Sequence, residues 1–101
     1  MTVAQMFRMI WIDAFLNDRS TGLRRATMQL IFDQSVPQTS IDLRRFMQHW
    51  PDRMVYNRSA KEYRATPGST PVFPLEVSAR VRIACLDSRI LRDAMEQGTG
   101  V

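Results

Sequence analysis

The stretch SVPQTSIDLRRF, residues 35–46, is typical of a helix with a polar and basic exposed side. Ser35 is a favourable N-cap residue, and Pro37 fits the first helical turn, where its missing N–H breaks no hydrogen bond. Pro51 ends the helix, because a proline disfavours helical geometry at the residue before it. The apolar side of the predicted helix is formed by Leu43, Phe46, Met47 and Trp50.

Two further helices are predicted before this one. Residues 4–17 repeat apolar side chains at three- and four-residue spacing, and residues 23–32 form a second, shorter segment. Two helices joined by the three residues "DQS" make a helix-turn-helix pattern. We expect the inward side of the second helix to be Leu23, Ala26, Leu30 and Ile31. We expect the core of the domain to include Ile10, Leu30, Leu43 and Phe46.

A β-hairpin is predicted directly after the third helix. In RMVYNRSAKEYRA, residues 53–65, a run from Met54 to Tyr56 and the run EYRA read as strands, separated by the polar tip NRSAK. Tyr56 and Tyr63 flank this tip and are expected to pack across the hairpin. The sequence therefore predicts a mainly α fold with a small β-hairpin, that is, a winged helix-turn-helix, followed by a C-terminal helix.

The predicted organisation has three parts: a DNA-binding domain at 1–66, a Pro/Gly/Ser/Thr-rich connector at 67–75, and a C-terminal element at 76–97. Alternating apolar residues from Val77 to Cys85 fit a strand, but the length of the segment favours a helix. Its helical stripe would be Ala79, Ile83, Leu86, Ile90 and Ala94. We expect this stripe to pack against a second copy and form a homodimer; the alternative is that it folds back on its own domain.

Charge is concentrated in the centre of the chain. The 101 residues carry a net charge of +4, and 45% of them are hydrophobic, which is enough for one modest core. Residues 19–64 hold nine basic and four acidic side chains. Lys61 is the single lysine, and the remaining basic residues are arginines, which suit the recognition of phosphate and carboxylate groups.

Several functional classes have no support in the sequence. A single cysteine, Cys85, and a single histidine, His49, leave neither an internal disulfide nor a cysteine-rich zinc site. Glycine-rich phosphate loops, serine elbows and paired acids are absent, so we expect neither an enzyme nor a cofactor. No stretch approaches the ~20 apolar residues of a membrane span, and nothing resembles a signal peptide. We therefore expect a cytoplasmic protein without a membrane partner.

The candidate partner is double-stranded DNA. In a helix-turn-helix the second helix enters the major groove, and its N-terminal residues meet base edges. Gln38 can pair with adenine, and Thr39 with thymine or phosphate. The full set of predicted DNA-contacting residues is Arg24, Arg25, Ser35, Gln38, Thr39, Ser40, Arg44, Arg45, Arg58, Ser59 and Lys61. The alternative is a protein-interaction module on the same scaffold, although such an interface favours aromatic residues over this polar set.

Residues 35–66 resemble the N-terminal winged helix-turn-helix of bacterial WYL-domain transcriptional regulators. The resemblance covers about residues 6–75, with "SVPQTS" and "SAKEY" as its most specific parts. It implies a dimeric, repressor-type DNA-binding protein. Where the family has a Gly-Ile turn this chain has Asp33-Gln34. The resemblance does not extend to the ligand-sensing WYL domain, so it does not imply control by a ligand. The matching residues are Ser35, Val36, Pro37, Gln38, Ser40, Asp42, Leu43, Phe46, Pro51, Tyr56, Ser59, Ala60, Lys61 and Tyr63.

Overall fold

The first helix, α1 (Val3–Leu16), begins at a capping box. The Thr2 hydroxyl accepts a hydrogen bond from the Gln5 backbone N–H at 3.1 Å, and the Gln5 side chain accepts one from the Thr2 N–H at 2.9 Å. These reciprocal bonds satisfy two N–H groups that have no partner within the helix. The structure is a computed structural model that describes residues 1–85.

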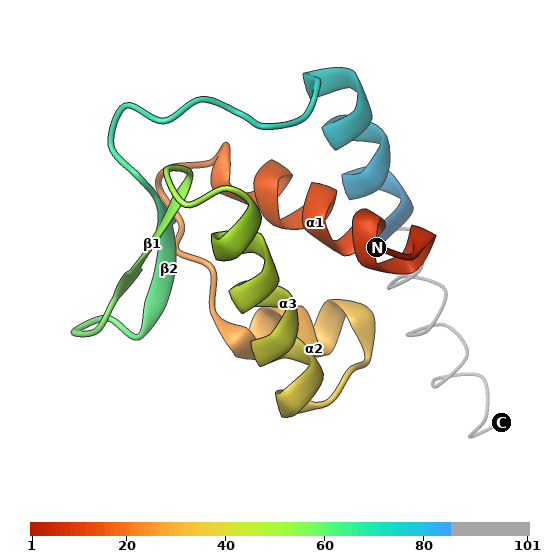
Figure 1. Ribbon diagram of the computed structural model, residues 1–101, viewed down its shortest axis with the longest axis horizontal. Coiled ribbons are helices and arrows are strands. Elements are labelled where there is room, and N and C mark those ends of the chain that lie inside the picture. Colours follow the sequence, from red (N-terminus) through yellow and green to blue (C-terminus); the bar gives the residue numbers. More distant parts are fainter. Residues whose placement is uncertain (86–101) are drawn as a thin grey trace, which may run out of the picture.

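Helices α2 (Arg25–Phe32) and α3 (Val36–His49) form the predicted helix-turn-helix (Figure 1). The Ser35 hydroxyl accepts a hydrogen bond from the Gln38 N–H at 3.2 Å, and Pro37 lies in the first turn, as expected. Asp33 ends α2 in the left-handed region, with φ of 50°. The turn between the two helices therefore needs only residues 33–35. Helix α3 packs against both α1 and α2.

The wing is an antiparallel hairpin of β1 (Met54–Asn57) and β2 (Glu62–Ala65), as predicted. Tyr56 stands opposite Tyr63, and their ring centroids are 4.7 Å apart. Tyr63 also exchanges two backbone hydrogen bonds, of 2.7 and 2.8 Å, with Leu23. The segment before α2 is thereby attached to the hairpin, so the wing and the helix-turn-helix are held in one unit.

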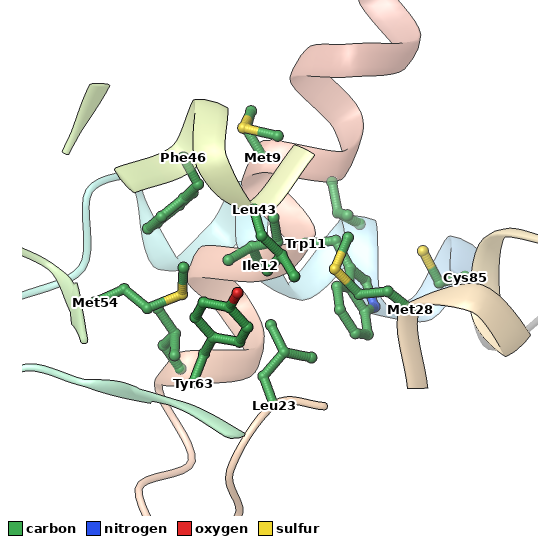
Figure 2. Close-up of a cluster of buried hydrophobic side chains, with 12 residues drawn as sticks. Met9, Trp11, Ile12, Leu23, Met28, Leu43, Phe46, Met54, Tyr63 and Cys85 are labelled. Atoms are coloured by element: carbon green, nitrogen blue, oxygen red, sulfur yellow. The ribbon is translucent and has the colours of Figure 1, made fainter. Parts of the chain in front are cut away.

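The core lies where the three helices meet the base of the hairpin (Figure 2). Leu43 and Phe46 are fully buried, as predicted, and Ile10 is half-buried. Leu30 and Ala26 were expected inside, but Leu30 is 58% exposed and Ala26 is exposed as well. The reason is that α2 starts at Arg25 and leaves Leu23 in the extended segment. The helix then turns Met28, rather than Ala26 and Leu30, toward the core.

A fourth helical segment covers residues 75–85 and lies along α1 (Figure 1). It packs on its own domain through Ser78, Val81 and Cys85, which are buried at helical spacing. The helix is confirmed up to that point. Two members of the predicted stripe lie outside this packed side, since Ala79 is exposed and Ile83 is 60% exposed, and the predicted contact of the stripe with a second copy stays a prediction. Leu86, Ile90, Ala94 and the rest of the predicted helix lie outside the described residues.

The connector is fastened to α1 by a buried ionic network. Asp13 accepts hydrogen bonds from Arg53 Nε at 2.8 Å and from the backbone N–H groups of Val72 and Phe73, both at 3.0 Å. Arg53 also donates to the Asn17 side chain at 2.8 Å. The segment after the hairpin is therefore held against α1, although it contains no regular structure of its own.

Candidate nucleic-acid interface

The outward side of α3 is the centre of the candidate interface. At helical spacing, Pro37, Ile41, Arg44 and Gln48 are exposed, with Ser40 half-buried beside them. The opposite side, with Thr39, Asp42, Leu43 and Phe46, is buried. This side thus presents one basic residue, Arg44, one amide, Gln48, and two apolar side chains, Pro37 and Ile41, of which Ile41 is 42% exposed.

Thr39 was predicted to contact DNA, and its burial contradicts that role. It is fully buried, and its hydroxyl donates to the Ser35 carbonyl at 3.0 Å and accepts from Gln34 Nε2 at 3.0 Å. The reason is rotational: the packing of Leu43 and Phe46 turns position 39 toward the domain. Thr39 and Gln34 instead brace the turn between α2 and α3. The Ser35 hydroxyl, likewise, is occupied by the N-cap bond.

Asp42 organises the predicted contact residues Gln38 and Arg45. Its fully buried carboxylate accepts hydrogen bonds from Arg8 Nε at 2.7 Å, Gln38 Nε2 at 3.1 Å and Arg45 Nη1 at 3.4 Å. Arg8 reaches this site from α1 and donates a second bond, from Nη2, at 3.3 Å. The side chains of Gln38 and Arg45 are therefore held at the edge of the exposed surface.

Arg44 differs from its neighbour Arg45. Arg44 is exposed and has neither an ion pair nor a hydrogen bond to another side chain within residues 1–85. The charge of Arg45, in contrast, is partly neutralised by Asp42. Of the two arginines, Arg44 is the one whose charge is fully available to a phosphate.

The wing tip carries the predicted basic residues in the open. Arg58, Ser59 and Lys61 are all exposed. The Asn57 side chain accepts a hydrogen bond from the Ala60 N–H at 3.1 Å, and Lys61 takes a left-handed φ of 54°. These features make a tight, locally braced tip. In the view of Figure 1, the tip and the N-terminal end of α3 point toward the same, lower side.

Arg24 and Arg25 lie between the wing and α2. The Arg25 guanidinium is 5.9 and 5.7 Å from the ring centroids of Tyr56 and Tyr63, and it donates to the Tyr63 hydroxyl at 3.0 Å. Arg24 is exposed and lies 3.7 Å from the buried carboxylate of Glu62. Arg25 therefore holds the wing in place, a role that the prediction of a phosphate contact did not include.

Glu62 also explains a glycine in this region. A Cβ atom at Gly22 would lie 2.2 Å from the Glu62 carboxyl carbon, so that no larger residue fits without moving the carboxylate. Arg64 Nε donates to Glu62 at 2.7 Å. The tip end of β2 is therefore packed closely against the segment before α2, and the charge of Glu62 is paired with Arg64 and Arg24.

The sequence analysis did not identify four residues of this region: Arg8, Ile41, Asp42 and Gln48. The i,i+4 spacing of Gln38 and Asp42 on one helix was a usable signal, because side chains at this spacing meet. Arg8 gave no such signal, since it is 34 residues from Asp42. Ile41 and Gln48 required knowledge of how α3 is rotated.

The part of the chain that the structure describes offers neither a metal-binding cluster nor a membrane-spanning helix. Within residues 1–85, no group of three or more His, Cys, Asp or Glu residues is placed to hold a metal ion. None of the helices in that part of the chain has the length and apolar composition needed to cross a membrane. The chain matches no protein-family model, and no curated protein shows significant sequence similarity to it.

Proposed function

We propose that this protein binds double-stranded DNA sequence-specifically and acts as a transcriptional regulator. In this proposal α3 enters the major groove and the wing contacts the adjacent backbone or minor groove. The observation that carries it is the exposed, internally unpaired Arg44 on the outward side of α3, on a scaffold whose wing exposes Arg58 and Lys61.

The distribution of paired and unpaired charges supports this proposal. Arg8 and Arg53 neutralise buried carboxylates, and Arg64 is paired with Glu62. Arg44, Arg58 and Lys61 form no ion pair within the described residues. A cationic side chain without an ion pair in the protein can bind a phosphate without breaking an internal bond. Its binding releases the counterions of that phosphate, and this release supplies most of the non-specific affinity for DNA.

The test is a selection from randomised duplexes, followed by affinity measurements over a range of salt concentrations. Arg44→Ala and Lys61→Ala should each reduce the slope of log affinity against log salt by about one unit. Arg80→Ala is the matched control, because Arg80 is an exposed arginine on the helical segment 75–85, away from α3 and the wing. Equal slopes for Arg44→Ala, Lys61→Ala and the control would refute the proposal.

One observation favours the alternative, a protein-interaction module. Val36 and Ile41 are exposed apolar residues on or beside the outward side of α3. On DNA, Ile41 would contact the methyl group of a thymine. On a protein partner, both would be buried in the interface. If the wild-type chain binds no duplex even at low salt, the protein-interaction function replaces the DNA-binding one.

We further propose that the regulator is a homodimer joined through its C-terminal region. Ile83 is exposed and lines a groove of about 340 Å³ with Trp11 and Phe15. Ile83→Glu should yield a folded monomer that binds a half-site weakly. Val3→Glu is the control, because Val3 is exposed in the first turn of α1, where an acidic residue is favourable. A wild type that is monomeric by light scattering at micromolar concentrations would refute the dimer.

A further inference from the structure

The strongest further inference concerns Asp42, the buried carboxylate beneath the exposed side of α3. Four hydrogen bonds converge on it: two from Arg8, one from Gln38 and one from Arg45. Arg8 belongs to α1, whereas Gln38 and Arg45 belong to α3. Both of these α3 residues are in the predicted DNA-contacting set. A buried group that contacts no DNA is thus bonded to two side chains that are proposed to do so.

The chemistry of the carboxylate fixes which way the Gln38 amide faces. An ionised Asp accepts hydrogen bonds and donates none, whereas an amide offers a donor on one side and an acceptor on the other. The Gln38 nitrogen must therefore face Asp42, because the reverse orientation would bring two oxygens together. Arg8, whose Nε lies 2.7 Å from the Asp42 Oδ2, supplies the opposite charge to this carboxylate.

We propose that Asp42 is a positioning residue that presents Gln38 to the DNA in a single orientation. This rests on the proposed DNA-binding function and deepens it. With its nitrogen anchored, Gln38 turns its oxygen outward and keeps one N–H group available. An outward acceptor beside a donor matches the adenine edge, which offers an amino donor at N6 and an acceptor at N7. Guanine presents acceptors at both of these positions, so the carbonyl oxygen of Gln38 rejects it.

The first experiment needs no DNA and uses the wild-type chain. Side-chain amide ¹⁵N relaxation compares Gln38 with Gln48, an exposed glutamine on the same helix. Gln38 is expected to be rigid, whereas the order parameter of Gln48 should fall below about 0.6, the range of flexible groups. Equal mobility of the two amides would overturn the proposal, whatever the DNA measurements show.

The second experiment separates positioning from a merely structural role. Asp42→Asn keeps the shape of the side chain but introduces a donor, so that Gln38 can adopt either orientation. The variant should lose about tenfold in discrimination at the one base pair where Gln38→Ala loses it. In the Gln38→Ala background, Asp42→Asn should cause no further loss of discrimination, because the two residues act through the same contact.

The outcomes are distinguishable. A uniform loss of affinity for all duplexes in Asp42→Asn, with discrimination intact, means that Asp42 only supports the fold, and this overturns the proposal. Failure of the wild type to bind any duplex refutes the DNA-binding function and the base preference with it, while the relaxation experiment still reports on the Gln38–Asp42 bond. If Asp42→Asn does not fold, the relaxation result decides.

Discussion

Two buried aspartates, Asp13 in α1 and Asp42 in α3, show how similar ionic clusters serve different regions of the molecule. Each is fully buried and bonded to an arginine, at 2.8 Å from Arg53 and at 2.7 Å from Arg8. Around Asp13 the other donors are backbone N–H groups of the connector, and Arg53 is itself buried. Around Asp42 the donors are side chains, and Arg8 and Arg45 remain 17% and 24% exposed.

The Asp13 cluster therefore fixes the path of the backbone, whereas the Asp42 cluster fixes side chains at the surface. The Asp13 cluster joins α1, the start of the hairpin and the connector, so its loss would release backbone. The Asp42 cluster joins α1 to the edge of the outward side of α3, so its loss would release side chains that can turn to water. An arginine that stays buried after losing its counter-charge is far more costly than an arginine that can turn to water.

The largest effect is expected for Asp13→Asn. The substitution leaves Arg53 buried without a counter-charge and should lower the free energy of unfolding by about 3–5 kcal/mol. Denaturant unfolding followed by circular dichroism measures this loss. Asp52→Asn is the control, since Asp52 is exposed, and should change stability by less than about 0.5 kcal/mol. A loss at position 13 no larger than that of the control would remove the structural role assigned to the cluster.

A smaller effect is expected for the matched substitution Asp42→Asn. Arg8 and Arg45 can extend into water when the carboxylate charge is lost, so the free energy of unfolding should fall by only about 1–3 kcal/mol. The same unfolding measurement, made in parallel, ranks the two sites. If Asp42→Asn proves more costly than Asp13→Asn, the distinction between backbone-holding and surface-holding clusters is wrong.

A third aspartate, Asp33, tests backbone geometry rather than charge. Asp33 has a φ of 50° at the end of α2, where glycine pays no steric penalty. Asp33→Gly should therefore raise the free energy of unfolding by about 0.5–1 kcal/mol. Asp52→Gly, at a turn position with an ordinary φ, should lower it instead. Destabilisation by both glycines would show that the left-handed turn does not strain Asp33.

The smallest effect is expected at Asp18, which is exposed. Hydrogen bonds from the Ser20 hydroxyl and backbone N–H lower the pKa of this carboxyl from its ordinary value of 3.8. Because the folded pKa lies below the unfolded one, the stabilisation is present above the unfolded pKa and is lost as the pH falls through the folded one. An NMR titration should show the Asp18 pKa rising in Ser20→Ala. An unchanged pKa would assign the shift to another cause.

The helices and the hairpin were predictable because their signals are local. Ser35 and Pro37 set the start of α3 and Pro51 follows its end, while Tyr56 and Tyr63 bracket a turn-rich tip. The boundary of α2 was less secure, since nothing local distinguishes Leu23 in an extended segment from Leu23 in a helix. Its bridge to Tyr63, 40 positions later, decided the matter and left Leu30 exposed.

The candidate site was predictable only as a set of exposed charges. The sequence by itself determined that a capped, basic-flanked helix and a basic wing exist, because capping, periodicity and turn chemistry act between near neighbours. The tertiary structure alone decided that Thr39 is buried, that Arg25 contacts the two tyrosines of the wing and that Arg8 reaches the carboxylate of Asp42. Those outcomes depend on the rotation of α3 against α1 and on contacts between residues such as Arg8 and Asp42, which only packing brings together.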